Sequence, residues 1–248
     1  MLDTHPSVIT LSDVKFSWTS GTPVLDIREL SIQRGEKVFI RGPSGSGKTT
    51  LLGLLGGVLT PELGSVSVLG TDLAQRSSAE RDHFRAEHIG FIFQMFNLIP
   101  YLSVIDNITL PLSFAKNRQA AVAKTGRSKK EEAIRLLKHL ELDDPALLTR
   151  SVTELSIGQQ QRVAAARALI GQPDIVIADE PTSALDTETR EAFIQLLFTE
   201  CKAAGSTLIF VSHDATLESL FDRSIALQEL NKAATPAKKT VEVPWCLL

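Results

Sequence analysis

The chain contains a glycine-rich loop, Gly42-Pro43-Ser44-Gly45-Ser46-Gly47-Lys48-Thr49, between two apolar runs. Val38-Phe39-Ile40 precedes the loop, and a leucine-rich run beginning at Leu51 follows it. A strand, a glycine loop and a helix in this order can wrap backbone N–H groups and a helix N-terminus around a chain of phosphates. Glycines suit such a loop because they approach closely and adopt left-handed angles without a Cβ clash. The complete GxxxxGK[ST] pattern therefore predicts a nucleotide-binding loop.

This loop also predicts individual contacts. Lys48 is expected to reach the β- and γ-phosphates of the nucleotide, and the Thr49 hydroxyl is expected to help hold Mg²⁺. The loop alone leaves kinases, GTPases and helicases open. An ordinary turn before a helix is the alternative, and the strand, loop and helix context disfavours it. The predicted nucleotide contacts here are Gly42, Pro43, Ser44, Gly45, Ser46, Gly47, Lys48, Thr49 and Thr50.

The composition bounds the class of protein. The chain has 248 residues, of which 43% are hydrophobic and 22% charged, as in soluble globular proteins. The net charge of −3 gives no reason to expect nucleic acid as the main partner. Two cysteines cannot build a disulfide framework, and we expect neither a signal peptide nor a membrane-spanning helix.

The pattern of apolar residues predicts a β-rich N-terminal part and then an α/β region. Alternation and turn residues favour strands at Val8–Leu11, Val14–Trp18, Leu30–Ile32, Lys37–Arg41 and Ser65–Leu69, with a helix from Lys48 to about Leu59. Towards the C-terminus, short apolar β-branched runs favour buried parallel strands at Ile175–Ala178 and Thr207–Val211. A helix is expected at Glu188–Ala204, stopped by Gly205.

Between these regions the sequence changes character. Residues from about Asn97 to Thr153 predict a helical insert, in which Lys129–Leu140 has the spacing of an amphipathic helix. The basic segment 116–130 holds six cationic residues and no acidic one, and we interpret it as a solvated loop rather than a binding patch. From Ala233 onward the composition predicts a loose tail.

A second helix N-terminus is predicted at Leu155-Ser156-Ile157-Gly158-Gln159. Ser156 can cap the helix, and Gln159, three residues later, completes a capping box. The helix is expected to run through Ile170 and to stop at Gly171. A serine hydroxyl and a glycine N–H at a helix N-terminus form a second anion-binding end, separate from the glycine loop.

At this point the chain resembles the ATP-binding-cassette ATPases, whose signature motif is Leu-Ser-Gly-Gly-Gln. The resemblance covers about residues 8 to 231, and the one departure in the motif is Ile157 in place of glycine. It implies an α/β fold of the P-loop NTPase, ABC type: a RecA-like parallel-sheet core, an antiparallel β subdomain and an inserted α-helical subdomain. Residues 1–232 would form this nucleotide-binding domain, with the helical subdomain at about 97–155 and a flexible tail at 233–248.

The resemblance also implies roles for particular residues. Mg²⁺ would be bound by Thr49, Gln94 and Asp179. Glu180 would act on the attacking water, and Gln94 and His213 would be the other catalytic residues. Ser183-Ala184-Leu185-Asp186 would cross a dimer interface. In a head-to-tail homodimer formed with ATP, the signature residues Ser156, Gly158 and Gln159 of one copy would contact the nucleotide of the other.

Two of these assignments keep alternatives from the residues themselves. Trp18 is expected to stack on adenine, with packing at a strand edge as the alternative. Asp179-Glu180 after an apolar strand could in isolation be a surface pair. The other histidines, His5, His83, His88 and His139, are interpreted as structural.

Within the family, Phe96-Asn97-Leu98-Ile99-Pro100 and the run Ile177–Asp186 are similar to the LolD and MacB type of lipoprotein-release and macrolide-export ATPases. That similarity implies a peripheral subunit on the cytoplasmic face of the inner membrane, paired with transmembrane permease subunits. The permease surface is expected to centre on the loop after Gln94 and the helical insert, where Phe96, Leu98, Ile99 and Leu102 would present an apolar surface. An importer ATPase is the alternative. A cassette acting on DNA or ribosomes is a further alternative, weakened by the short segment between Lys48 and Leu155 and by the acidic charge balance.

Overall fold

The structure is a computed structural model, and it describes residues 6–183, 185 and 187–233. The chain divides into two compact units. The first holds residues 1–85 and 209–248, and the second holds residues 86–208. In the described residues, no helix is both long and apolar enough to cross a membrane.

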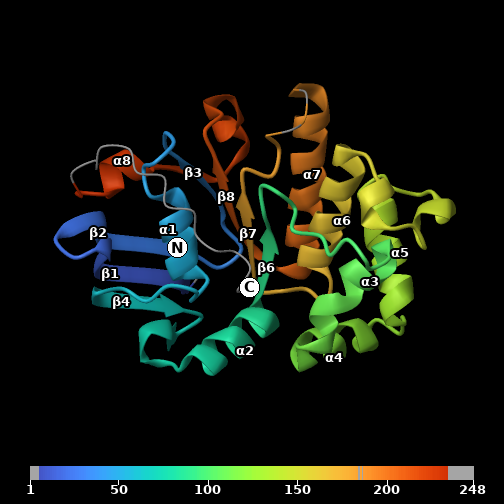
Figure 1. The fold of residues 1–248 in the computed structure, drawn as a ribbon, viewed down its shortest axis with the longest axis horizontal. Helices are drawn as coiled ribbons and strands as arrows, with labels where there is room; N and C mark the ends of the chain where they lie inside the picture. Colours follow the sequence, from blue (N-terminus) through green and yellow to red (C-terminus); the bar gives the residue numbers. More distant parts are fainter. Residues whose placement is uncertain (1–5, 184, 186, 234–248) are drawn as a thin grey trace, which may run out of the picture. The chain divides into compact units, whose positions relative to one another are not determined.

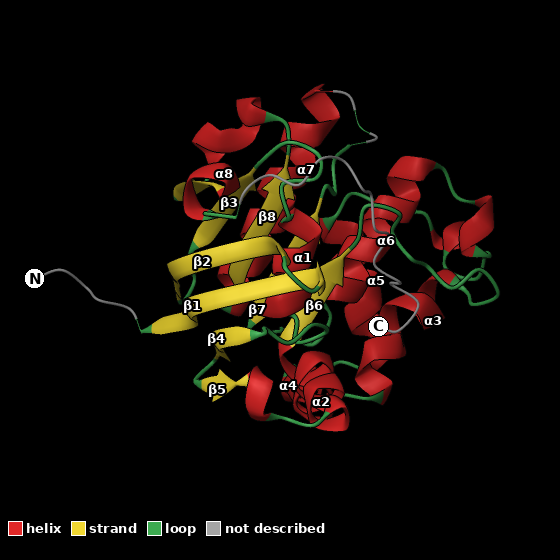
Figure 2. Ribbon diagram, turned by 60° about the vertical axis from the view of Figure 1, so that its left-hand side comes forward, coloured by secondary structure: helices red, strands yellow, loops and turns green. Residues whose placement is uncertain are grey.

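An antiparallel sheet forms much of the first unit (Figure 2). Its strands are β1 (Ser7–Thr19), β2 (Thr22–Gln33), β4 (Leu63–Val68) and β5 (Thr71–Asp72), in the order β2-β1-β4-β5. We expected two strands where β1 is one. The polar interruption at Ser12-Asp13 is a bulge against β4, with Asp13 at φ 49°, whereas the register with β2 continues through it unbroken.

The first unit also holds the strand and helix that flank the glycine loop. β3 (Lys37–Arg41) leads to α1 (Lys48–Leu55), and β3 pairs in parallel with β9 (Arg223–Ala226), which runs into α8 (Leu227–Leu230). β8 (Thr207–Ser212), which contains the division between the units, is the other neighbour of β3. A cluster of three rings, Phe39, Phe210 and Phe221, fills the space beside these strands.

Helix α1 ends earlier than the sequence analysis predicted. Its last residue is Leu55 rather than about Leu59. Gly57 adopts φ 67°, its N–H donates to the Leu54 carbonyl at 3.0 Å, and the Val58 N–H donates to the Gly53 carbonyl at 2.9 Å. A left-handed glycine that closes the last carbonyls is a common helix stop, and it acts here before Pro61 can.

The second unit has a parallel strand pair covered by long helices. β6 (Ile89–Ile92) pairs with β7 (Ile175–Asp179), and Ile92 lies opposite Ala178. The long helices are α6 (Ile157–Leu169) and α7 (Thr187–Ala204). A Cβ at Gly90 of β6 would clash with the Ala168 carbonyl of α6, so glycine permits the close packing of that strand and helix.

Shorter helices complete the second unit. They are α3 (Val104–Thr109), α4 (Lys116–Lys124) and α5 (Lys129–His139), and α3 and α5 lie beside α6 (Figure 1). Helix α2 (Ser78–His88) contains the first division between the units. Short 3₁₀ helices lie at Leu73–Gln75, Leu110–Ser113, Pro145–Leu147, Val152–Glu154 and Ala215–Leu220.

The amphipathic prediction for α5 is confirmed, whereas the prediction for the basic segment is wrong. Ala133, Leu136, Leu137 and Leu140 are all buried. Residues 116–124 form α4 instead of a solvated loop, and Arg118 is buried there. Its guanidinium donates from Nε to the Ile170 carbonyl at 2.9 Å, which satisfies the end of α6. Charge alone could not reveal that this cation turns inward.

Candidate functional site

In the first unit, the lysine of the glycine loop forms hydrogen bonds with the backbone of the same loop. The Lys48 Nζ donates to the carbonyl oxygens of Gly42 at 2.6 Å and of Pro43 at 3.1 Å. The Ser46 N–H also donates to the Pro43 carbonyl at 3.2 Å. The ammonium group is therefore held across the loop, at the level where the backbone turns into α1.

Two glycines of this loop are required by close contacts. Gly47 has φ 96°, and a Cβ there would lie 2.8 Å from the Leu25 Cδ2 of β2. A Cβ on Gly42 would lie 2.6 Å from the Ser46 Oγ. Gly47 is also the N-cap of α1, which has no side-chain cap and no acidic residue in its first turn. The positive end of α1 is thus left to a ligand rather than to its own side chains.

Trp18 lies near this loop through a chain of contacts inside the first unit. Its ring makes an edge contact with Phe16, with centroids 5.1 Å apart and planes at 85°. Phe16 stands opposite Leu25 in the β1–β2 register, and Leu25 is the residue that crowds Gly47. Trp18 is half-buried, so part of its indole remains accessible.

His213 follows β8 directly, as the glycine loop follows β3, the neighbouring strand. The histidine is exposed, and its neighbours form a tight local turn. The Asp214 N–H donates to the Ser212 Oγ at 3.1 Å, and the Asp214 carboxylate accepts from the Thr216 N–H at 3.1 Å. This turn fixes the backbone on which His213 stands.

In the second unit, β7 ends on the two predicted carboxylates. Asp179 is its last residue, and Glu180 follows with φ 46° and only 8% of its surface exposed. The Glu180 carbonyl accepts from the Ser183 N–H at 3.2 Å. A left-handed glutamate is uncommon and costs conformational energy, as is often found where a side chain must be aimed. No local sequence pattern predicts this backbone geometry.

The parallel register brings Gln94 to the same edge as these carboxylates. Ile92 lies opposite Ala178, so Phe93 and Gln94 leave β6 where Asp179 and Glu180 leave β7. Gln94 is exposed. The carboxyl ends of parallel strands are where α/β proteins place ligand chemistry. The residues with these amide and carboxylate side chains therefore follow neighbouring strands at the same edge of the pair.

The predicted capping box of α6 is confirmed. The Ser156 N–H donates to the Gln159 Oε1 at 2.9 Å, and the Gln159 N–H donates to the Ser156 Oγ at 3.3 Å. Ile157 has 57% of its surface exposed. A Cβ on Gly158 would lie 4.0 Å from the Leu185 Cδ2, which is ordinary contact. Ala184 and Asp186 of the neighbouring predicted interface loop lie outside the described residues.

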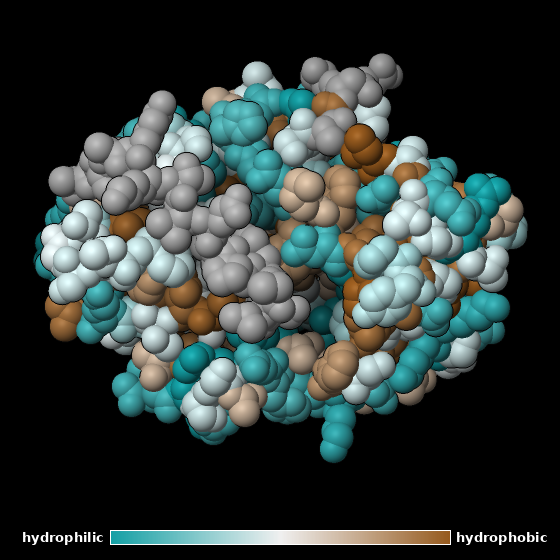
Figure 3. All heavy atoms as spheres, viewed as in Figure 1, coloured by the Kyte–Doolittle hydropathy of each residue, from teal (hydrophilic) through white to brown (hydrophobic). Residues whose placement is uncertain are grey.

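The segment after Gln94 corrects one expectation. We expected Phe96, Leu98, Ile99 and Leu102 to present an apolar surface, but Phe96 is 9% exposed and the other three are half-buried. The exposed large side chains here are Met95 at 81% and Tyr101 at 83%. On the face drawn in Figure 3, hydrophobic residues appear among hydrophilic ones over the helices coloured yellow-green in Figure 1. Phe96 is buried in a left-handed backbone conformation, φ 60°, which the spacing of apolar residues does not reveal.

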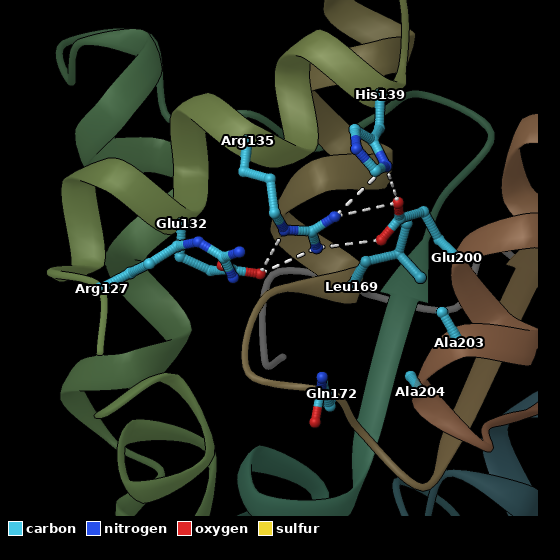
Figure 4. A pocket seen from close by; sticks show the side chains of 9 residues that line it. All are labelled: Arg127, Glu132, Arg135, His139, Leu169, Gln172, Glu200, Ala203 and Ala204. Carbon is cyan, nitrogen blue, oxygen red and sulfur yellow. Dashed lines mark hydrogen bonds and ion pairs between the residues drawn. The ribbon is translucent and has the colours of Figure 1, made fainter. Parts of the chain in front are cut away.

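A separate pocket of about 360 Å³ lies in the second unit and is lined by charged and small residues (Figure 4). Arg135 lies between two buried carboxylates and donates to the Glu132 Oε1 at 2.8 Å and the Glu200 Oε2 at 3.0 Å. His139 Nδ1 lies 2.6 Å from the Glu200 Oε1. Burial alone would raise the pKa of Glu200, but the bonds from Arg135 and His139 outweigh it and lower that pKa.

This network joins α5 to α7 and is a structural feature. His88 likewise contacts an acid, with Nδ1 2.8 Å from the Asp174 Oδ2. Both agree with the structural interpretation of these histidines. His5 lies outside the described residues.

Comparison with known proteins identifies the family. Residues 25–183 match the ABC transporter family. The chain is 41% identical to the ABC transporter ATP-binding protein MJ0796 of Methanocaldococcus jannaschii over 225 residues, 90% of this chain and 94% of the relative. It is 37% identical to the lipoprotein-releasing system ATP-binding protein LolD of Bacteroides fragilis over 206 residues, 82% of this chain and 90% of the relative.

A solved structure agrees with these sequence matches. A dimeric, post-hydrolysis structure of the MJ0796 cassette bound to ADP and Pi superposes with a TM-score of 0.77 and 33% identity. The match covers 95% of this chain and 99% of that one. The two helix N-termini, the carboxylates after β7 and these matches agree: the chain belongs to the ABC transporter family, as an ATP-binding subunit with ATPase activity of the LolD- and MacB-like group.

Proposed function

We propose that this chain works as a head-to-tail homodimer that hydrolyses ATP to drive a separate membrane permease of the lipoprotein-release or macrolide-export type. The observation that carries the proposal is the presence of two different phosphate-binding helix ends in one chain, α1 after Gly47 and α6 after Ser156. The 37% identity to LolD supports the choice of system. The dimeric form of the MJ0796 cassette supports the assembly.

The glycine loop would bind the triphosphate of ATP. Its backbone N–H groups and the uncapped end of α1 favour an anion. Lys48, now bonded to two carbonyls of the loop, would exchange those bonds for β- and γ-phosphate oxygens. Trp18 would stack on adenine with the accessible part of its indole.

The second helix end would act on the ATP held by the other copy. Ser156 accepts one N–H of its own helix, so its hydroxyl hydrogen stays available to a γ-phosphate oxygen. Gly158 would add its N–H, with no side chain to keep a phosphate away. Gln159 would hold Ser156 in place through the capping box.

Hydrolysis would be carried by side chains that follow strands. Glu180, held at φ 46° and largely buried, is assigned as the general base that takes a proton from the attacking water. Gln94 would orient that water, and His213 would contact the γ-phosphate. A base with a fixed backbone loses little entropy when water and phosphate are brought into line.

The donor set fits Mg²⁺. The predicted ligands are the Thr49 hydroxyl, the Gln94 amide oxygen and the Asp179 carboxylate, all hard oxygen donors. No group of three or more His, Cys, Asp or Glu side chains suited to a metal occurs in the described part of the chain. That composition suits an ion that keeps most of its ligands from phosphates and water. When bound, Mg²⁺ would neutralise phosphate charge during transfer.

The partner would be a permease, and the subunit would lie at the cytoplasmic face of the inner membrane. We propose residues 1–232 as the nucleotide-binding domain, with the helical subdomain at about 97–155. Met95 and Tyr101, the most exposed large side chains after Gln94, are the proposed permease contacts. Tyr101→Asp should abolish stimulation of ATPase activity by the permease without changing ATP affinity. Lys124→Asp on α4 is the control charge change. Normal stimulation of Tyr101→Asp would place the contact elsewhere.

The decisive experiment concerns Glu180. Glu180→Gln keeps the shape and hydrogen bonding of the side chain but removes the proton acceptor, and losing a general base typically costs about 10²–10⁴ in rate. ATP binding should survive, so the variant should accumulate as an ATP-bound dimer. Size-exclusion chromatography with Mg-ATP should show this dimer, while wild type returns to monomer after turnover. A monomeric variant, or one with wild-type turnover, would contradict the proposal.

A further inference from the structure

A half-buried arginine joins two parts of the second unit that the proposed function uses separately. Arg167 lies in the last turn of α6, the helix that begins at Ser156. Its Nη1 donates to the Asn97 carbonyl and its Nη2 donates to the Phe96 carbonyl, both at 2.6 Å. The planar fork of the guanidinium therefore grips two successive peptide groups shortly after Gln94.

The gripped turn has a backbone that needs support. Phe96 has φ 60° and Asn97 has φ 47°, so two successive residues that are not glycine are left-handed. The turn is closed by bonds from the Phe96 N–H to the Phe93 carbonyl at 2.9 Å and from the Asn97 N–H to the Met95 carbonyl at 2.7 Å. Such a conformation persists only where its surroundings hold it, and a phenylalanine is an uncommon occupant.

The positive charge of Arg167 strengthens its two hydrogen bonds to the turn. In the described part of the chain, its side-chain hydrogen bonds go to these two carbonyl oxygens and to no carboxylate. Burial lowers the pKa of Arg167 to about 10. A desolvated cation strongly favours keeping its hydrogen bonds, and charge-assisted bonds are short and strong. Moving the turn away from α6 would leave the guanidinium without its acceptors.

We propose that Arg167 is a positioning residue that ties the turn after Gln94 to α6, so that a displacement of this turn is passed along the helix to Ser156. The helix has 13 residues and spans roughly 20 Å at about 1.5 Å per residue. The proposal rests on the proposed function in one respect: Gln94 and Ser156 are taken to act on ATP. The link would make the two ATP contacts move together.

Hydrogen exchange tests the link in the isolated chain, without nucleotide or permease. In Arg167→Ala, the amides of Phe96 and Asn97 should exchange at least about tenfold faster, because local opening no longer breaks two charged bonds. Arg167→Lys, which keeps the charge but loses the fork, should be intermediate and serves if the alanine variant does not fold. Arg162→Ala is the matched control on α6, since its guanidinium lies 3.6 Å from Glu141 and, among the described residues, makes no hydrogen bond to the turn.

Activity then distinguishes positioning from a general loss of stability. Arg167→Ala should keep wild-type ATP affinity but lose most of the permease stimulation of kcat, and Arg167→Lys should restore part of it. Wild-type exchange at Phe96 and Asn97, or a uniform rise over all amides, would overturn the proposal, as would normal stimulation. A wild-type chain that no permease stimulates would instead contradict the proposed function, while the exchange result would still decide whether Arg167 holds the turn.

Discussion

Helices α1 and α6 both begin at a motif for phosphate, yet they treat their own N-termini in opposite ways. Helix α1 starts at left-handed Gly47 with no side-chain cap. Helix α6 starts at Ser156 in an extended conformation, with both bonds of a capping box formed. The first end has no side-chain cap of its own, whereas the second is already capped by Ser156 and Gln159.

This difference assigns different tasks to the two ends. An uncapped end gains most from a ligand, so α1 should supply the main affinity for ATP. A capped end has less to gain, so α6 should add weaker contacts that matter when a second copy arrives. Helix α5 offers a comparison inside the same chain, because Ser128 and Glu131 form the same capping box with no proposed ligand.

The substitution with the greatest expected loss of ATP affinity lies at the start of α1. Lys48→Ala removes a cation proposed to contact two phosphate groups, and each charged hydrogen bond is worth about 1.5–3 kcal/mol, so the ATP dissociation constant should rise at least about 100-fold. Equilibrium binding of a fluorescent ATP analogue measures the change. Lys15→Ala, which removes an exposed cation 3.5 Å from Asp26 on the same unit, is the control and should bind normally. Unchanged affinity in Lys48→Ala would contradict the assignment of α1 as the main source of ATP affinity.

At α6, the effect should appear in assembly rather than in binding. Ser156→Ala should leave the ATP affinity of the single chain near wild type but prevent the ATP-bound dimer in a Glu180→Gln background. Loss of the cap should also lower the free energy of unfolding by about 1 kcal/mol. Size-exclusion chromatography and denaturant unfolding give the two readouts.

Ser128→Ala is the matched control for that variant. It removes the cap of α5, so it should cost a similar free energy of unfolding and leave dimer formation intact. If both serine variants lose the dimer, the effect is one of stability. If neither does, Ser156 does not contact ATP.

Trp18 is expected to make a smaller contribution to ATP affinity than Lys48. Stacking on a base is worth roughly 1–3 kcal/mol, so Trp18→Ala should raise the ATP dissociation constant about tenfold, less than Lys48→Ala. Tyrosine at this position should restore most of the affinity. Phe16→Leu, at the neighbouring ring, tests packing alone. Equal losses in Trp18→Ala and Phe16→Leu would make Trp18 a packing residue.

The smallest effect concerns pH and separates the two capping boxes. The backbone N–H and the hydroxyl of Ser128 hold the pKa of Glu131 below its usual value. A lowered folded pKa gives a contribution that is present above the unfolded pKa and is lost as pH falls through the folded one. The α5 cap should therefore weaken in acid. Gln159 does not titrate, so the α6 cap should persist. Amide exchange at Glu131 and Gln159, each corrected for its intrinsic rate, should diverge below about pH 4.

Much of this protein could be predicted along the chain. The glycine loop, the Ser156 capping box and the amphipathic α5 each depend on residues close in sequence, where the spacing itself defines a turn, a cap or a helix face. The carboxylates after the apolar run at Ile175 also followed from order along the chain. Such features are local, so the identities of nearby residues suffice.

Other features of this protein depend on groups that are far apart in the sequence, and only the folded structure determines them. Arg118 was predicted in a solvated loop but turns inward to the carbonyls that end α6, and Phe96 is buried in a turn held by Arg167. Glu180 takes a left-handed angle that no local pattern announces. In each case burial supplies the reason: a desolvated cation or a strained backbone is stable only where distant carbonyls and packing compensate it, and those partners exist only once the chain has folded.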